Sequence, residues 1–136
     1  MPVYLEVINQ PDAADLADLE KIYADYPLPP VASFVDWLFD QRESGRTLVG
    51  GRFNGRLLAA LWLRREDNGA TIEHLCVRAM TRRRGTARQL LQMLQQQAGQ
   101  FQLPQLRVEQ SSRAAELAPL WEGLGFSADE RGWHWP

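Results

Sequence analysis

The sequence predicts an α/β domain built on a mixed central sheet, in the order β-α-α-β-β-β-α-β-α-β. Two observations carry this prediction. Three strand-like runs, 47–53, 57–63 and 71–77, follow one another across short turns, and the first of these turns is Asn54-Gly55. Asn-Gly between two apolar runs is a strong hairpin signal, because both residues tolerate a positive φ. Apolar residues at spacings of three and four lie on both sides of these runs and predict flanking helices.

Size and composition narrow the class of protein. The chain has 136 residues, which fits a single domain over residues 1–136. A net charge of −2 indicates that the protein as a whole is not a polyanion-binding protein. The single cysteine, Cys76, excludes an internal disulfide framework, and two histidines, His74 and His134, argue against a histidine metal site. No early apolar run resembles a signal peptide or a membrane span. We therefore expect a cytoplasmic protein with no metal site and no membrane partner.

The N-terminal part of the chain predicts one strand and two helices. Residues 3–8 are rich in β-branched and aromatic types, which favours a strand. The next apolar residues share one helical face: Leu16, Leu19, Tyr23 and Tyr26. The cluster Pro27-Leu28-Pro29-Pro30 ends that helix, because proline lacks an N–H and disfavours helix in the residue before it. Ser33 followed by Asp36 predicts a capped start for the second helix.

The central strands differ in their patterns. The run 57–63 is almost continuously apolar, as expected of a central strand covered on both faces. The run 71–77 alternates, so a regular strand would place alternate side chains on opposite faces. One face would carry Thr71, Glu73, Leu75 and Val77, and the other Ile72, His74 and Cys76.

The C-terminal half predicts two further helices and two strands. After Gly85, apolar residues recur at helical spacing: Ala87, Leu90, Leu91, Leu94 and Ala98. A strand at 106–108 precedes a helix at 112–124, which Pro119 should kink or restart. Gly125 is placed to cap that helix, and the tail through Trp133 and Trp135 predicts one last short strand.

The segment Arg82-Arg83-Arg84-Gly85-Thr86-Ala87 lies where a strand gives way to a helix. A helix N-terminus has about four unpaired N–H groups and roughly half a positive charge, so it favours pyrophosphate. Gly85 would let the backbone approach phosphates closely, and the arginines would add charge-assisted hydrogen bonds. The alternative reading of the same triplet is a solvated helix start. A nucleic-acid patch ranks third, because the run is short, has no interleaved aromatics and lies in an acidic chain.

The stretch from Leu75 to Leu91 resembles motif A of the GNAT acetyltransferase superfamily, in which Gln/Arg-x-x-Gly-x-Gly/Ala follows the fourth strand. Arg82, Gly85 and Ala87 stand at the three defining positions, and "LWEGLGF" (residues 120–126) is similar to the superfamily's closing segment. The resemblance implies the GNAT fold and an acetyl-CoA (CoA) ligand. The residues it implies as ligand contacts are Leu75, Cys76, Val77, Thr81, Arg82, Arg83, Arg84, Gly85, Thr86, Ala87 and Arg88.

Within this superfamily, "GRFNGRLLAALW", "VRAMTRRRG" and "LGFSADERGW" resemble the PanZ (PanM) family. That family implies an acetyl-CoA-sensing regulator that binds the zymogen of aspartate 1-decarboxylase, promotes its self-cleavage and restrains the mature enzyme, so that pantothenate synthesis follows acetyl-CoA. The expected partner contacts are Arg52, Asn54 and Arg78.

Candidate catalytic residues are few. Many members of the superfamily have, just before the closing "xxLGF", a tyrosine that protonates the departing thiolate. In this sequence Trp121 stands at that position. Ala114 stands where an asparagine often lies. The indole N–H only donates and does not act as an acid at ordinary pH. Glu73 could serve as a general base if its carboxylate is half-buried, or it could simply face solvent or an arginine. His74 and Cys76 are weaker candidates for a base and a nucleophile.

Two functions from different classes remain. The first is an acetyl-CoA-dependent regulator that acts by binding another protein. The second is an N-acetyltransferase that acts on an amine of a small molecule or protein. Trp121 favours the first, and Glu73 keeps the second open.

Overall fold

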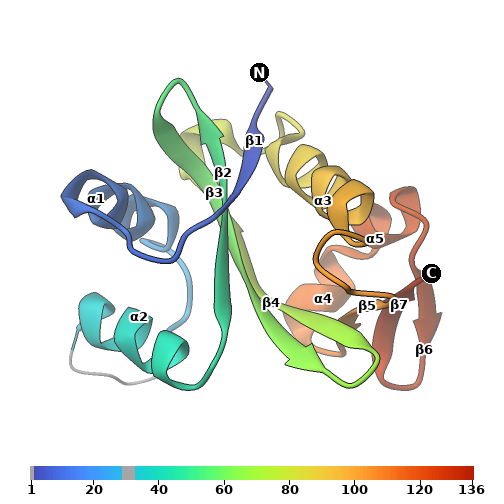
Figure 1. Cartoon of the computed structure of the whole chain (residues 1–136). Coiled ribbons are helices and arrows are strands. Elements are labelled where there is room, and N and C mark those ends of the chain that lie inside the picture. Colours follow the sequence, from blue (N-terminus) through green and yellow to red (C-terminus); the bar gives the residue numbers. More distant parts are fainter. Residues whose placement is uncertain (1, 29–32) are drawn as a thin grey trace.

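The computed structural model describes residues 2–28 and 33–136 (Figure 1). Pro29 and Pro30 of the predicted helix-ending cluster lie outside these residues. In chain order the elements are β1 (Tyr4–Val7), α1 (Ala13–Ile22), α2 (Phe34–Glu43), β2 (Thr47–Phe53), β3 (Arg56–Glu66), β4 (Gly69–Val77), the 3₁₀ turn η1 (Ala79–Thr81), α3 (Thr86–Gln97), β5 (Leu106–Glu109), α4 (Ser112–Glu116), α5 (Ala118–Gly123), β6 (Ser127–Asp129) and β7 (Gly132–Trp135). None of the helices in these described residues is long and apolar enough to cross a membrane.

The strands form one seven-stranded sheet in the order β1-β2-β3-β4-β5-β7-β6. Every neighbouring pair is antiparallel except β4 and β5, which are parallel. Helices α1 and α2 cover one face and α3, α4 and α5 cover the other, which gives three layers (Figure 1). The mixed α/β sheet that the sequence predicts is therefore confirmed.

Two apolar cores lie on the two faces of this sheet. On the side of α3, the buried leucines Leu90, Leu91 and Leu94 pack on β2, β3 and β4. On the side of α1 and α2, the core is aromatic and contains Trp37 and Trp62. The continuously apolar β3 contributes to both cores, as its sequence predicts.

Local turn chemistry also follows the sequence. Asn54 (φ 49°) and Gly55 (φ 78°) both adopt positive φ at the β2–β3 hairpin. The Ser33 side chain accepts a hydrogen bond from the amide of Asp36 and caps α2. Pro119 lies in the first turn of α5 and marks a restart of the helix after α4. Sequence analysis predicts one final strand, whereas β6 and β7 form a hairpin of two.

The alternation predicted for 71–77 is wrong, because β4 carries a bulge at His74. That residue has φ 52°, and the register against β3 shifts there: Ala60 pairs with Cys76, but Trp62 pairs with Glu73. As a result Glu73 shares the face of His74 and Cys76, while Ile72 and Leu75 pack together in the opposite core.

Candidate functional site

The two parallel strands in the middle of the sheet diverge and leave the edge of β4 open. Strands β4 and β5 pair only where Ala70 faces Leu106 and Thr71 faces Arg107. Beyond that point β4 continues to Val77, while the chain after β5 turns away into α4. A V-shaped opening results, with β4 as one wall and α4 and α5 as the other.

A groove of about 680 Å³ follows this opening to the N-terminus of α3. It is lined by Leu75, Cys76, Val77, Thr81, Arg82, Arg83, Gly85, Thr86, Ala87, Arg88, Arg113, Glu116, Leu117 and Leu120. The structure thus brings together all the residues predicted to contact the ligand except Arg84, which is exposed and does not line the groove.

The segment 78–85, which we call the arginine loop, forms one end of the groove and leads into the uncapped start of α3. The Thr81 hydroxyl donates to the carbonyl of Arg78 at 2.9 Å, and the Thr86 hydroxyl donates to the carbonyl of Thr81 at 3.3 Å. Two residues then adopt positive φ, Arg83 at 66° and Gly85 at 76°. No side chain caps the N-terminus of α3, and a Cβ at Gly85 would meet nothing within 4 Å. The first amides of α3 are therefore accessible to an anion.

The arginines around this terminus differ in their contacts. The Arg82 Nε donates to the carbonyl of Val77 at 3.1 Å, and its Nη1 lies 3.4 Å from a carboxylate oxygen of Asp25. Arg88 donates to the carbonyl of Gly123 at 3.2 Å. Arg83 and Arg84 are exposed. Arg82, Arg83 and Arg88 therefore line the groove near the open end of α3.

Arg113 closes the other end of the groove, and sequence reasoning missed it. It projects from α4 across the opening, and its Nη2 donates to the Leu75 carbonyl at 2.8 Å. Its guanidinium carbon lies 4.9 Å from the centre of the Tyr26 ring. From sequence alone, an arginine just after a helix start is expected to be exposed to solvent. Its contact with β4 becomes apparent only in the folded structure.

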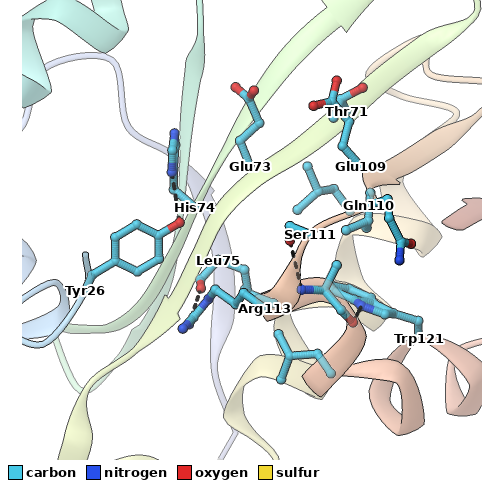
Figure 2. Close-up of a pocket in the computed structure, with 14 residues that line it drawn as sticks. Tyr26, Thr71, Glu73, His74, Leu75, Glu109, Gln110, Ser111, Arg113 and Trp121 are labelled. Atoms are coloured by element: carbon cyan, nitrogen blue, oxygen red, sulfur yellow. Dashed lines mark hydrogen bonds between the residues drawn. The ribbon is translucent and has the colours of Figure 1, made fainter. Parts of the chain in front are cut away.

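A second pocket of about 200 Å³ continues beyond Arg113, and Leu75, Arg113 and Leu117 line both spaces. Figure 2 shows the Tyr26 hydroxyl directed at the His74 ring, and these groups are hydrogen-bonded at 2.9 Å. Tyr23 donates to the backbone carbonyl of His74 at 2.7 Å. Burial lowers the pKa of His74, and burial raises the pKa of Tyr26. The bulged residue is thus held by two tyrosines.

Glu73 lines the second pocket but is held by two arginines. One carboxylate oxygen lies 2.6 Å from Arg46 Nε, and the other lies 3.0 Å from Arg64 Nη1. Its side chain is 15% exposed. The alternative in which Glu73 faces an arginine therefore describes the structure.

Trp121 and Cys76 both have structural partners. The indole N–H of Trp121 donates to the carbonyl of Ala114 at 3.1 Å inside the core, so this position offers no acid (Figure 2). The Cys76 thiol points to the α1 side and donates to the carbonyl of Ile22 at 3.1 Å. Burial raises the pKa of this thiol, which opposes formation of a nucleophilic thiolate.

The three expected partner contacts lie near the tip of the β2–β3 hairpin. Asn54 is exposed at the tip itself. The amide of Arg78 donates to the carbonyl of Leu58, which brings the start of the arginine loop beside the part of β3 that follows the hairpin turn. Arg52 is already engaged, because its guanidinium pairs with Glu6 at 2.5 Å and with Asp15 at 3.1 Å.

Comparison with known proteins identifies the family. A family model described as "Acetyltransferase (GNAT) domain, PanZ" matches residues 2–134. The chain belongs to this family. The chain is also similar to the PanD regulatory factor of Escherichia coli K12, with 30% identity over 122 residues that cover 88% of this chain and 87% of that protein.

Solved structures share the fold. A solution structure of the putative N-acetyl transferase YhhK from E. coli, bound to coenzyme A, has a TM-score of 0.70 and 24% identity, and 98% of each chain is covered. The ribosomal-protein-S18-alanine N-acetyltransferase from E. coli has a TM-score of 0.72 and 19% identity, covering 97% of this chain and 89% of that one. The GNAT fold predicted from motif A is therefore confirmed.

Proposed function

We propose that this chain binds acetyl-CoA in the groove and, in that state, binds the zymogen of aspartate 1-decarboxylase, promotes its maturation and regulates the mature enzyme. The observation that carries the proposal is the uncapped N-terminus of α3 at the end of a groove that Arg82, Arg83 and Arg88 line, in a chain of the PanZ family. The relative's name, PanD regulatory factor, supports the partner.

The pyrophosphate of the ligand fits the open end of α3. The amides in the first turn of α3, which begins at Thr86, have no intrahelical partner, and the helix dipole adds partial positive charge there. A Cβ added at Gly85 would meet no atom within 4 Å, so the start of α3 is open at this residue. Arg83 and Arg88 line the same end and supply full positive charges.

The pantetheine arm fits along the open edge of β4. On the edge away from β3, the stretch from Leu75 to Val77 has no neighbouring strand, so the backbone groups of that edge face the groove. Leu117 and Leu120 on the opposite wall supply apolar contact. An extended chain with amide groups can therefore lie between a polar strand edge and an apolar helix surface.

The groove ends beside the expected partner surface. The arginine loop forms one end of the groove, and hydrogen bonding through Arg78 and Leu58 joins this loop to the β2–β3 hairpin. A ligand that orders the loop therefore also fixes the exposed arginines of a segment that is tied to this hairpin. This arrangement allows ligand and partner to stabilise each other through one segment.

A thermal-unfolding assay with acetyl-CoA tests the ligand. At about 100 times its dissociation constant, the ligand should add roughly 2.7 kcal/mol to the free energy of unfolding. Gly85→Glu places a negative charge in the anion site and should abolish this stabilisation. Gly45→Glu is the matched control, because Gly45 also has a positive φ (83°) and open space around its Cβ but lies outside the groove. An equal ligand shift in both variants would place the ligand elsewhere.

The alternative function is an N-acetyltransferase acting on an amine. The second pocket favours this alternative, because the pocket extends the groove and is lined by His74 and Glu73. The engaged carboxylate of Glu73 and the buried indole of Trp121 favour the regulator instead.

A further inference from the structure

Arg113 marks the end of the groove that is remote from the anion site. Strand β4 runs from Leu75 through Val77 into the arginine loop, so Leu75 is the groove residue of β4 farthest along the strand from that loop. Arg113 reaches the carbonyl of Leu75, and both residues also line the second pocket (Figure 2). A ligand with its phosphates at α3 and its arm along β4 therefore brings its acyl end to Arg113.

The guanidinium of Arg113 keeps donors available at this junction. Among the described residues, its hydrogen bonding to protein consists of the Nη2 contact to Leu75. A guanidinium has five N–H donors, so others remain for a ligand. The contact to Leu75 and the stacking on Tyr26 hold the group in place before any ligand arrives. A fixed donor loses little side-chain freedom on binding, which favours affinity.

The acyl group is the one part of acetyl-CoA that CoA lacks. Its thioester carbonyl oxygen accepts hydrogen bonds, whereas the thiol of CoA is only a weak donor and acceptor. The methyl group beyond the carbonyl requires an apolar space, and Leu75 and Leu117 line the entrance to the second pocket. We propose that Arg113 donates to the thioester carbonyl and is the residue by which this protein distinguishes acetyl-CoA from CoA. This inference rests on the proposed function.

Such discrimination is what an acetyl-CoA sensor needs, because specificity is a difference between two affinities. The phosphate and pantetheine contacts are common to both ligands and contribute equally to each. Only a contact at the acyl end separates them. A hydrogen bond from a charged donor is worth a factor of about ten or more in affinity, so Arg113 alone can supply a useful preference.

Calorimetric titration of the full chain with acetyl-CoA and, separately, with CoA tests the assignment. The wild type should bind acetyl-CoA about tenfold more tightly than CoA. Arg113→Met should bring the ratio of the two dissociation constants close to one, mainly by weakening acetyl-CoA. Arg113→Lys keeps a charged donor and should retain part of the preference. Arg83→Met, at the phosphate end of the same groove, should weaken both ligands by the same factor and leave the ratio intact.

The ratio separates the outcomes. An unchanged preference in Arg113→Met, or an equal loss for both ligands, would mean that Arg113 merely ties α4 to β4 and would overturn the inference. Equal affinity of the wild type for the two ligands would overturn it as well, while leaving the groove as a CoA site. A wild type that binds neither ligand would overturn the proposed function itself.

Discussion

Glu73 is the side chain whose chemistry depends most on its neighbours. A carboxylate in the middle of a central strand could act as a base if it were free, but here each oxygen accepts from a different guanidinium, that of Arg46 or Arg64. Arg64 also pairs with Glu66 and Glu109, so the group belongs to a network of charges. A carboxylate in such a network is held in place and is not free to collect a proton from an amine.

We therefore predict that acetyl-CoA turnover with a broad panel of amines stays at the uncatalysed rate. The wild type, Glu73→Gln and Glu109→Gln should be indistinguishable in a free-thiol assay. Glu109→Gln is the matched control, because Glu109 lines the same pocket and pairs with the same Arg64. Amine-dependent turnover in the wild type that is lost in Glu73→Gln and retained in Glu109→Gln would promote the acetyltransferase reading.

Residue-level contacts of this kind were the least predictable from sequence. The residue types on β4 show that Glu73 could matter, but its partner Arg46 is 27 positions away and shares no local pattern with it. The same holds for Arg113, whose acceptor Leu75 is 38 positions away. Backbone-determined features did better, because the Arg-x-x-Gly-x-Ala spacing fixes the open start of α3 from local conformation alone.

Elements are positioned by a few buried polar contacts as well as by the cores. Asp18 of α1 is 1% exposed, and its carboxylate accepts from the amide of Leu57 at 3.0 Å and from Arg56 at 2.6 Å. These contacts fix α1 against the start of β3. The hydrogen bond from Arg56 is the main reason that the pKa of Asp18 lies below its usual value.

Asp18→Asn should therefore lower the free energy of unfolding at pH 7 by about 1–3 kcal/mol, as expected for a buried charged hydrogen bond. Because the folded-state pKa is lowered, the contribution of Asp18 is present above the unfolded value of about 4 and is lost as pH falls through the folded value. The difference between wild type and variant should accordingly shrink toward low pH in urea titrations.

The exposed Asp40 on α2 provides the control for this measurement. Asp40→Asn should change the free energy of unfolding by no more than about 0.5 kcal/mol. A loss in Asp18→Asn that matched the control, or that grew on acidification, would contradict the role given to Asp18.

The faces of β4 show where element-level prediction failed. A period of two holds only for a regular strand, and one bulge at His74 moves Glu73 to the other face. Nothing in the local sequence signals this bulge, which is held by Tyr23 and Tyr26 from the segment that follows α1. Proline and glycine predicted helix boundaries better than alternation predicted the faces of β4. Pro119 and Gly125 set the start and end of α5 through their own backbone geometry.

At the scale of the whole molecule, the fold and the groove at the start of α3 followed from the sequence more readily than the proposed partner surface did. The order of strands and helices is set by patterning along the entire chain, and the family motif adds the uncapped start of α3. A partner surface depends on which exposed residues become neighbours. Hydrogen bonding brings Arg78 beside Leu58 of β3, in the same hairpin as Asn54, whereas the guanidinium of Arg52 forms ion pairs with Glu6 and Asp15.

The central claim is that acetyl-CoA binding and partner binding are linked through the arginine loop. Calorimetry of the purified chain with the aspartate 1-decarboxylase zymogen, with and without acetyl-CoA, measures this linkage directly. We expect tight association only with acetyl-CoA present, and the zymogen should tighten acetyl-CoA binding by the same factor. Asn54→Gly, which suits the positive φ at this position, should weaken the complex and leave acetyl-CoA affinity of the free chain unchanged. Absence of binding at tens of micromolar zymogen with acetyl-CoA present would contradict the claim.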